Sequence, residues 1–267
     1  MNKILADSEI QDSSRKMKIV PESVSYSDAE MRDKLLQLDK TCCIVKNGDS
    51  VGVCLKEDAD ESSSGSSMSL LAQALPLKTT QLGDPEFIKF HGLKMAYMTG
   101  SMANGIASEN LVISSGKVGL LSSFGAAGLL PSRIEKAIKI IQKALPDGPY
   151  AFNLIHSPSE DAIERAAVDL YLKYGVRTVE ASAFLGLTPN IVRYRVAGLR
   201  RSTQNQVEIT NRVIAKISRA EVASKFMAPA PEAMLNKLLE EKSITREQAQ
   251  LAAAVPMADD ITVEADS

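Results

Sequence analysis

The segment that decides the fold runs from Met95 to Gly128: MAYMTGSMANGIASEN (95–110) is followed, from residue 118, by VGLLSSFGAAG. This order is typical of a strand, a glycine turn, a short helix, a second strand and a second glycine turn. The glycines just past the apolar runs are Gly100, Gly105, Gly125 and Gly128. Such glycines let a chain leaving a parallel sheet turn sharply and bring backbone N–H groups close to a ligand. We therefore expect an anion or a phosphorylated cofactor there; ordinary loop glycines are the alternative.

Strands and helices alternate from this segment to the end of the chain. The pattern predicts strands at 95–99, 118–122, 150–156, 178–183, 212–218 and 261–266, and helices at 131–145, 159–174, 189–199, 221–226, 231–240 and 245–254. Repeated strand–helix units predict a parallel sheet with helices outside it. A (β/α)8 barrel and an open doubly wound sheet both satisfy that rule.

Alternation along the strands decides between the two folds. Polar residues share one parity, namely Asn153, Glu180, Ser182, Lys216, Ser218, Glu264 and Asp266, whereas Phe152, Val179, Ala181, Ile217 and Val263 share the other. Barrel strands face helices on one side and the lumen on the other, so polar side chains are expected only on the lumen side. The fold class predicted is therefore α/β, an incomplete TIM-type barrel of about six strands. We expect Asn153, Glu180, Lys216 and Glu264 to converge at the C-terminal ends of adjacent strands.

The N-terminal part predicts a small α+β region. Residues 1–27 are polar and aperiodic, which indicates a loose lead-in, and a helix capped by Ser27 is expected to run to Leu38. Residues 41–45 and 51–55 form a hairpin pattern around Asn47-Gly48, which places Cys42, Cys43 and Cys54 on a small sheet as buried free thiols. The acidic, then serine-rich stretch 57–69 indicates a flexible linker. We place the boundary near residue 85, giving regions 1–85 and 86–267.

Composition excludes several classes of function. The chain has 267 residues, a net charge of −2, 45% hydrophobic and 24% charged residues, as soluble globular proteins do. This balance argues against nucleic acid as the main partner, and the short basic cluster of Arg193, Arg195, Arg200 and Arg201 is interpreted as a solvated helix end. No stretch reaches the ~18 apolar residues of a membrane span, and three cysteines without a Cys-x-x-Cys spacing predict a reducing, cytoplasmic setting.

Several common catalytic motifs do not occur in the sequence. Gly100 and Gly105 are followed by Ile-Ala, not by Lys-Ser or Lys-Thr, so the segment is not a nucleotide P-loop. Gly-x-Gly-x-x-Gly and His-Glu-x-x-His are absent. Only His91 and His156 are present, so no metal site is predicted. His156, at a strand end beside Ser157-Pro158, could face a ligand, but we interpret it as a hydrogen-bonded loop histidine.

A family resemblance rests on long motifs. These are the glycine segment, FNLIHSP (152–158), VEASAF (179–184), IAKISRAEVA (214–223), PAP (229–231) and VPMADDITVEADS (255–267). Together they resemble the trans-acting enoyl reductases of polyunsaturated fatty acid and polyketide synthases, the PfaD type. That family belongs with the FMN-binding nitronate monooxygenase-like (2-nitropropane dioxygenase) barrels. The resemblance covers residues 83–267.

The resemblance implies a flavin site. FMN would lie at the barrel mouth and relay a hydride from NADPH to a 2-enoyl chain bound to an acyl carrier protein, with fatty acid or polyketide synthase subunits as partners. Matched by position, Met102, Ala103 and Asn104 lie along the flavin ring, Asn153 is a strand-end flavin contact and Lys216 is the basic residue near the ring. Supporting positions behind them are Glu180, Ser182 and Glu264. The alternative for Lys216 is a structural ion pair with Glu180 or Glu264.

One departure from the family bears on activity. In the family, the Glu-Ala-Asp-Ser strand continues into Gly-Gly-His, so the catalytic histidine would lie beyond Ser267. We therefore expect this chain to be the N-terminal portion of a longer enzyme, either a fragment or the product of a split gene. It would need the C-terminal half of the barrel as a partner. Alone it is expected to bind no stoichiometric FMN. The alternatives are a nitronate monooxygenase-like flavoenzyme and a non-catalytic half-barrel interaction subunit.

Overall fold

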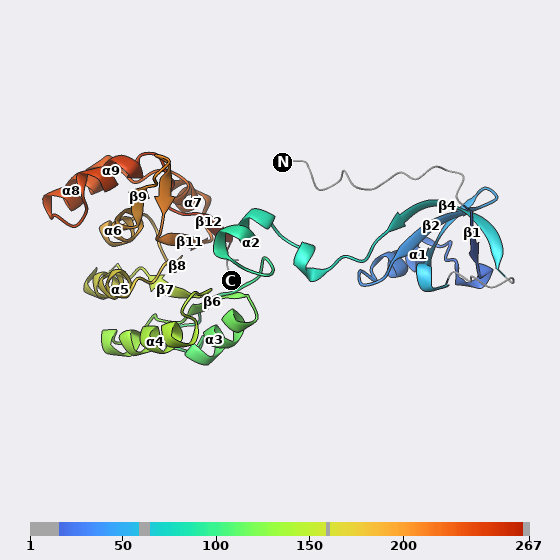
Figure 1. Ribbon diagram of the computed structural model, residues 1–267, viewed down its shortest axis with the longest axis horizontal. Helices are drawn as coiled ribbons and strands as arrows, with labels where there is room; N and C mark the ends of the chain where they lie inside the picture. The colour runs from blue at the N-terminus through green and yellow to red at the C-terminus, as the bar shows by residue number, and fades with distance from the viewer. Residues whose placement is uncertain (1–15, 59–64, 159–160, 264–267) are drawn as a thin grey trace. The chain divides into compact units, whose positions relative to one another are not determined.

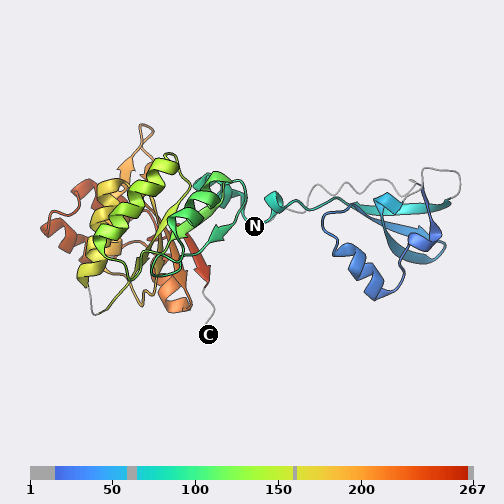
Figure 2. The ribbon, with the colours of Figure 1, turned by 90° about the horizontal axis from the view of Figure 1, so that it is seen from below.

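The computed structural model describes residues 16–58, 65–158 and 161–263. The chain divides into two compact units, the first ending at Leu82 and the second beginning at Gly83. In Figures 1 and 2 the first unit is blue to turquoise, and the second continues through green and yellow to red.

The N-terminal unit is an antiparallel sheet with a helix packed beside it. Its elements are β1 (Lys16–Ile19), η1 (Pro21–Ser23), α1 (Asp28–Leu35), β2 (Cys42–Asn47), β3 (Ser50–Leu55), η2 (Lys56–Asp58), β4 (Ser66–Ala74) and η3 (Thr79–Gln81), with strand order β1-β4-β2-β3. The predicted hairpin is confirmed as β2 and β3, which turn at Gly48 with a φ of 59°. All three cysteines are buried and free, as predicted.

Three expectations for this unit were wrong. The lead-in contains β1, and the serine-rich stretch is not all linker because β4 begins at Ser66. The two strands pair with each other, and Met68 of β4 is only 1% exposed, in the core of the sheet. The composition of this stretch does not indicate a strand, because the strands that pair with β4 are distant in the sequence. Helix α1 ends at Leu35 instead of Leu38.

The second unit is a curled, six-stranded parallel sheet with helices around it. Its elements are α2 (Pro85–His91), β5 (Met98–Thr99), α3 (Glu109–Lys117), β6 (Leu121–Phe124), α4 (Pro131–Ala144), β7 (Ala151–Ile155), α5 (Asp161–Tyr174), β8 (Thr178–Ser182), α6 (Pro189–Ala197), β9 (Leu199–Arg201), β10 (Val207–Ile209), β11 (Arg212–Ile217), α7 (Ala220–Phe226), α8 (Glu232–Glu240), α9 (Arg246–Ala252) and β12 (Asp260–Val263). The strand order is β12-β11-β8-β7-β6-β5, and neighbouring strands run parallel. The predicted incomplete TIM-type barrel is confirmed as a half-barrel.

The two faces of the sheet carry different side chains, as the alternation predicts. The outer face packs Phe124, Phe152 and Val179 into a large core with the surrounding helices. Figure 1 shows α3, α4, α5 and α6 following one another around this side. The inner face carries a second, smaller apolar cluster that includes Leu121 and Ile214. An alternating strand can serve both environments because successive side chains point to opposite faces.

Helix α2, which the sequence analysis did not predict, covers the start of the inner face. Asp84 caps it by accepting a hydrogen bond from the Glu86 N–H, and Gly92 ends it with a φ of 69°. Phe87 and Ile88 of this helix pack against the inner apolar cluster. Because that cluster includes the first residues of β6 and β7, α2 gives the half-barrel an apolar floor at the N-terminal ends of its strands.

The loops after β5 and β6 are bonded to each other. The Asn104 N–H donates to Ala127 O at 2.8 Å, the Gly105 N–H to Gly125 O at 2.9 Å, and the Gly125 N–H to Ala107 O at 3.0 Å. A Cβ built on Gly125 would lie 1.7 Å from the Met102 carbonyl oxygen. The expectation that Gly105 and Gly125 offer their N–H groups to a ligand was therefore wrong. Instead, Gly125 lets the two backbones pack in direct contact, and Gly105 supplies a φ of 71° that favours glycine.

Strand β6 starts later than predicted. Helix α3 runs to Lys117, and Gly119, with a φ of 79°, turns the chain before β6 begins at Leu121. Helix α6 ends at Ala197, and β9 pairs with β10 in an antiparallel hairpin that the sequence analysis missed.

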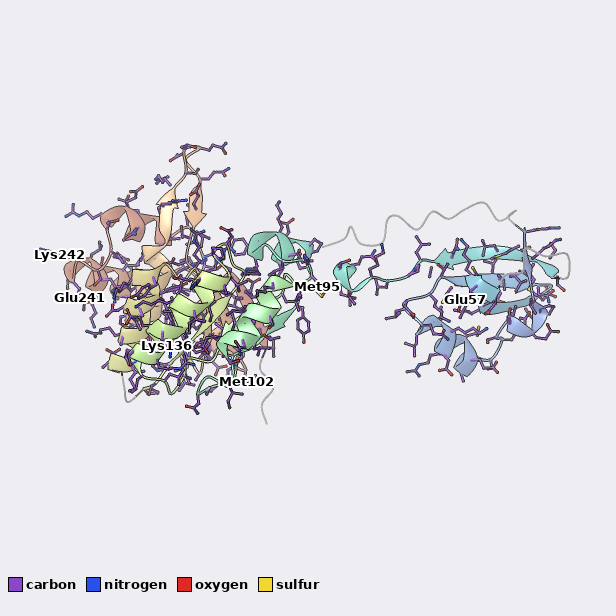
Figure 3. The ribbon with its side chains drawn as sticks, turned by 60° about the horizontal axis from the view of Figure 1, so that its bottom comes forward. Glu57, Met95, Met102, Lys136, Glu241 and Lys242 are labelled. Atoms are coloured by element: carbon purple, nitrogen blue, oxygen red, sulfur yellow. The ribbon has the colours of Figure 1, made fainter. Side chains whose placement is uncertain are left out.

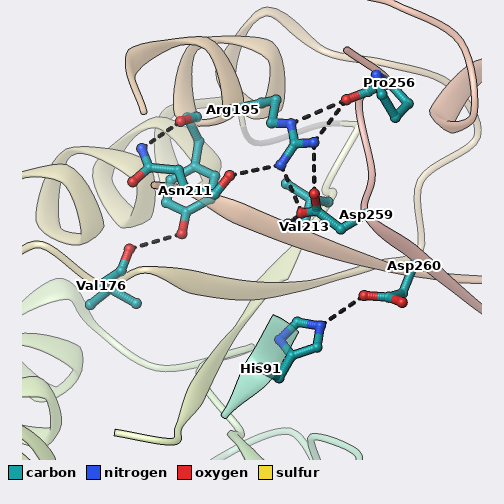
Figure 4. Close-up of polar contacts among 9 residues, drawn as sticks. His91, Val176, Arg195, Asn211, Val213, Pro256, Asp259 and Asp260 are labelled. Atoms are coloured by element: carbon teal, nitrogen blue, oxygen red, sulfur yellow. Dashed lines mark hydrogen bonds and ion pairs between the residues drawn. The ribbon is translucent and has the colours of Figure 1, made fainter. Parts of the chain in front are cut away.

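Arg195 was wrongly interpreted as part of a solvated helix end. Its side chain is 1% exposed and forms two hydrogen bonds to the Asp259 carboxylate, Nη1 to Oδ2 at 2.7 Å and Nη2 to Oδ1 at 2.9 Å. Nε and Nη2 also donate to Pro256 O, and Nη1 donates to Asn211 O. Figure 4 shows this guanidinium joining the end of α6 to the segments that precede β11 and β12. Arg200, one of the two exposed arginines of the predicted cluster, pairs with Glu208.

Replacing Arg195 with methionine is expected to destabilise the fold by about 3–5 kcal/mol, because it leaves the buried Asp259 carboxylate unpaired. Urea unfolding followed by circular dichroism measures this. The matched control is Arg200→Met, which removes an exposed ion pair and is expected to cost at most about 1 kcal/mol. Equal losses in the two variants would contradict the structural role given to Arg195.

Replacing Gly125 with alanine is expected to destabilise the second unit by about 1–3 kcal/mol, because the added Cβ overlaps the Met102 carbonyl and forces the loops apart. Gly186→Ala is the control, since its Cβ would meet only the flexible end of Lys225, at 3.4 Å. Unfolding free energies of the two variants test the prediction. An unperturbed Gly125→Ala variant would show that the two loops do not need their observed contact.

Candidate functional site

Three of the predicted polar residues meet on the inner face of the sheet. Asn153 on β7 pairs in register with Glu180 on β8, and the Lys216 ammonium of β11 lies 3.7 Å from the Glu180 carboxylate. Asn153 and Glu180 are 3% and 1% exposed, whereas the Lys216 side chain retains 23% of its accessible surface. Their predicted convergence on one face is confirmed, but Asn153 and Glu180 lie in the middle of β7 and β8 and not at the C-terminal ends; Glu264 lies outside the described residues. Of the alternatives for Lys216, the contact with Glu180 is present.

Asn153 is fixed by its neighbours. Its Nδ2 donates to Ser182 Oγ at 2.8 Å and to the Glu180 carbonyl at 3.2 Å. Its own carbonyl accepts a hydrogen bond from the Tyr171 hydroxyl at 2.6 Å. Burial raises the pKa of Tyr171, so this hydroxyl stays protonated and remains a donor. Nδ2 donates its hydrogen bonds to Ser182 and Glu180. The acceptor atom Oδ1 is therefore the part of the Asn153 side chain that could bond to a ligand.

Glu180 also contacts the loop after β5. Its Oε2 accepts a hydrogen bond from the Ser101 N–H at 2.8 Å. A Cβ built on Gly100 would lie 3.4 Å from Oε1, so the carboxylate passes close to the backbone at this point. The sequence analysis treated Gly100 as a turn residue and did not single out Ser101. No local signal links them to Glu180, because the contact spans 79 residues.

The segment Met102–Asn104 is exposed on a backbone that is held in place. All three residues are exposed, and Met102 retains 46% of its surface. Figure 3 shows Met102 at the outside of the second unit. Asn104 adopts a left-handed conformation, with a φ of 56°, and its N–H is bonded to the loop after β6. The segment therefore holds exposed side chains in a fixed position at the C-terminal edge of the sheet.

His156 has partners of its own, as predicted. Its Nδ1 lies 2.9 Å from Oε2 of Glu164, and its ring stacks on Phe184 at 5.3 Å. Thr188 donates a second hydrogen bond to the Glu164 carboxylate, which is almost fully buried. Glu164 was missed in the sequence, although a charged residue on the apolar side of α5 is a signal that could have found it. This cluster lies on the helix side of the sheet, away from the Lys216 ammonium.

Two other features are absent from the parts of the chain that the structure describes. In residues 16–58, 65–158 and 161–263, no group of three or more His, Cys, Asp or Glu side chains is arranged to hold a metal ion. No helix within these ranges is long and apolar enough to cross a membrane.

Comparison with known proteins gives relatives of one kind. No protein-family model matches the chain. A polyunsaturated fatty acid synthase component from Thraustochytrium sp. is 53% identical over 192 residues, which are 72% of this chain and 13% of that protein. The polyketide biosynthesis protein PksE of Bacillus subtilis is 47% identical over 187 residues, 70% of this chain and 24% of that protein. The chain thus spans only a small part of the curated relatives it matches.

A solved structure has the same fold. The enoyl reductase domain of MlnA, from the macrolactin biosynthesis cluster of Bacillus amyloliquefaciens, superposes with a TM-score of 0.68 at 38% identity, covering 71% of this chain and 43% of that chain. The match confirms the resemblance that the motifs predict. Most of this chain is therefore homologous to a region shared by polyunsaturated fatty acid synthase components and polyketide biosynthesis proteins, and it has the fold of part of an enoyl reductase domain.

Proposed function

We propose that this chain supplies the N-terminal half of an FMN-dependent enoyl reductase that uses NADPH and acts in trans on 2-enoyl chains carried by an acyl carrier protein. The observation that carries the proposal is the Lys216 ammonium on the inner face of the half-barrel, joined through Glu180 to the loop that bears Met102. The homology to an enoyl reductase domain of known fold supports it. Synthase subunits are the expected partners, since the relatives are synthase components.

The residues present fit a flavin by their chemistry. When bound, FMN would supply the hydride relay between NADPH and the carbon–carbon double bond. Lys216 would hold a fixed positive charge where the reduced ring is negative, which stabilises that form. Asn153 Oδ1 would accept a hydrogen bond, and Met102, Ala103 and Asn104 would provide the surface along which the ring lies.

The polar layer of Asn153, Glu180 and Lys216 on the inner face is suited to stabilising charge on a bound ligand. The apolar floor made by α2 and the first residues of β6 and β7 keeps water away from one side of the Lys216 and Glu180 charges. Charges act more strongly in such surroundings than in water. The pair also keeps the ammonium in one place, so little reorganisation is needed when charge develops on a bound ring.

A fusion protein tests the proposed function. The part of the MlnA enoyl reductase domain that this chain does not cover is joined after Ser267, and the MlnA domain itself serves as the reference. We expect the fusion to be yellow and to oxidise NADPH only when an enoyl thioester of an acyl carrier protein is present. Oxygen-dependent turnover of a nitroalkane would instead indicate a nitronate monooxygenase. A soluble, folded but colourless fusion beside a yellow MlnA domain would favour the non-catalytic interaction subunit.

In the flavin-loaded protein, Lys216→Met is expected to lower the reduction potential of the flavin, because it removes the cation that offsets the charge of the reduced ring. Dye-linked potentiometry measures the shift. The matched control is Lys225→Met on α7, where the ammonium contacts the Leu185 carbonyl instead of the inner face. If both variants keep the wild-type potential, Lys216 is a structural partner of Glu180 and nothing more.

A further inference from the structure

The Glu180 carboxylate joins two elements that are far apart in the sheet. It belongs to β8, whereas Ser101 follows the edge strand β5, with β6 and β7 lying between them in the strand order. The curl of the sheet lets Oε2 accept the Ser101 N–H at 2.8 Å across the inner face. The carboxylate also passes beside the backbone at Gly100, where an added Cβ would lie in ordinary van der Waals contact with Oε1, at 3.4 Å.

The same carboxylate is the partner of Lys216. The 3.7 Å separation from Oε1 to Nζ links β8 to β11, on the other side of β8 from β5. The Glu180 side chain is 1% exposed. A buried carboxylate is costly unless charges and N–H groups satisfy it, so its two contacts depend on each other.

We propose that Glu180 is a positioning residue that sets the place of the Met102–Asn104 loop and of the Lys216 ammonium together. In this role it does not touch the ligand. It holds the backbone directly before Met102 with one oxygen and holds the cation with the other. The proposal rests on the proposed function for the identity of the ligand, but the clamp itself is a property of this chain.

Two substitutions separate the two contacts. Glu180→Gln keeps a side-chain oxygen that can accept the Ser101 N–H, but it removes the charge that holds Lys216. Glu180→Ala removes both contacts and leaves the Ser101 N–H without an acceptor. The matched control is Glu164→Gln, which alters an equally buried carboxylate that contacts His156 and Thr188 instead of the loop.

Hydrogen exchange of the 267-residue chain, without any cofactor, tests the clamp. We expect the Ser101 amide to exchange about tenfold faster or more in Glu180→Ala, in line with the loss of a hydrogen bond to a charged group. Glu180→Gln and Glu164→Gln are expected to stay near the wild-type rate. If the alanine variant does not fold, Glu180→Asp, one methylene shorter, is expected to show the same acceleration. An unchanged Ser101 rate in the folded variant would overturn the proposal.

The potential of the flavin tests the second contact. In the fusion with the MlnA remainder, Glu180→Gln is expected to raise the reduction potential, because it removes a negative charge beside Lys216. The shift is opposite in sign to that of Lys216→Met. An unchanged or lowered potential would contradict the proposed contact of Glu180 with the Lys216 ammonium in the flavin-loaded protein. Failure of the fusion to bind flavin would count against the proposed function, while the exchange experiment would still decide whether the clamp exists.

Discussion

The buried guanidinium of Arg195 is the interaction on which the second half of the sheet depends. All five of its N–H groups have acceptors, on Asp259, Pro256 and Asn211, so its burial leaves no donor unsatisfied. The carboxylate of Asp259 also accepts the Val213 N–H, which ties the entry of β12 to β11. Through this contact the register of β11 is fixed, and with it the point at which Lys216 meets Glu180.

The site is therefore assembled in layers. The α2 floor closes the N-terminal end of the inner face with apolar side chains, and the polar layer of Asn153, Glu180 and Lys216 lies beyond it. At the C-terminal edge, the interlocked loops after β5 and β6 carry the exposed Met102. Parallel sheets commonly bind ligands at this edge, because several loops meet there on a rigid scaffold.

Features that follow a short period could be predicted from the sequence. Alternation in strands placed Asn153, Glu180 and Lys216 on one face, and the repeated strand–helix order gave the half-barrel. Contacts between distant residues could not be predicted in this way. In the sequence, nothing distinguishes Arg195 from the other arginines of its cluster, because its partner Asp259 is 64 residues away. Glu180 and its partner Ser101 are separated by 79 residues. The serine-rich start of β4 likewise becomes a strand only through its partners.

The most direct test of the central claim is a crystal structure of the fusion with the MlnA remainder, grown with FMN. The account predicts flavin density along Met102, Ala103 and Asn104, with the Lys216 ammonium beside the ring and the Ser101 N–H still bonded to Glu180. Flavin bound elsewhere, with Lys216 turned away from it and paired only with carboxylates, would contradict the account.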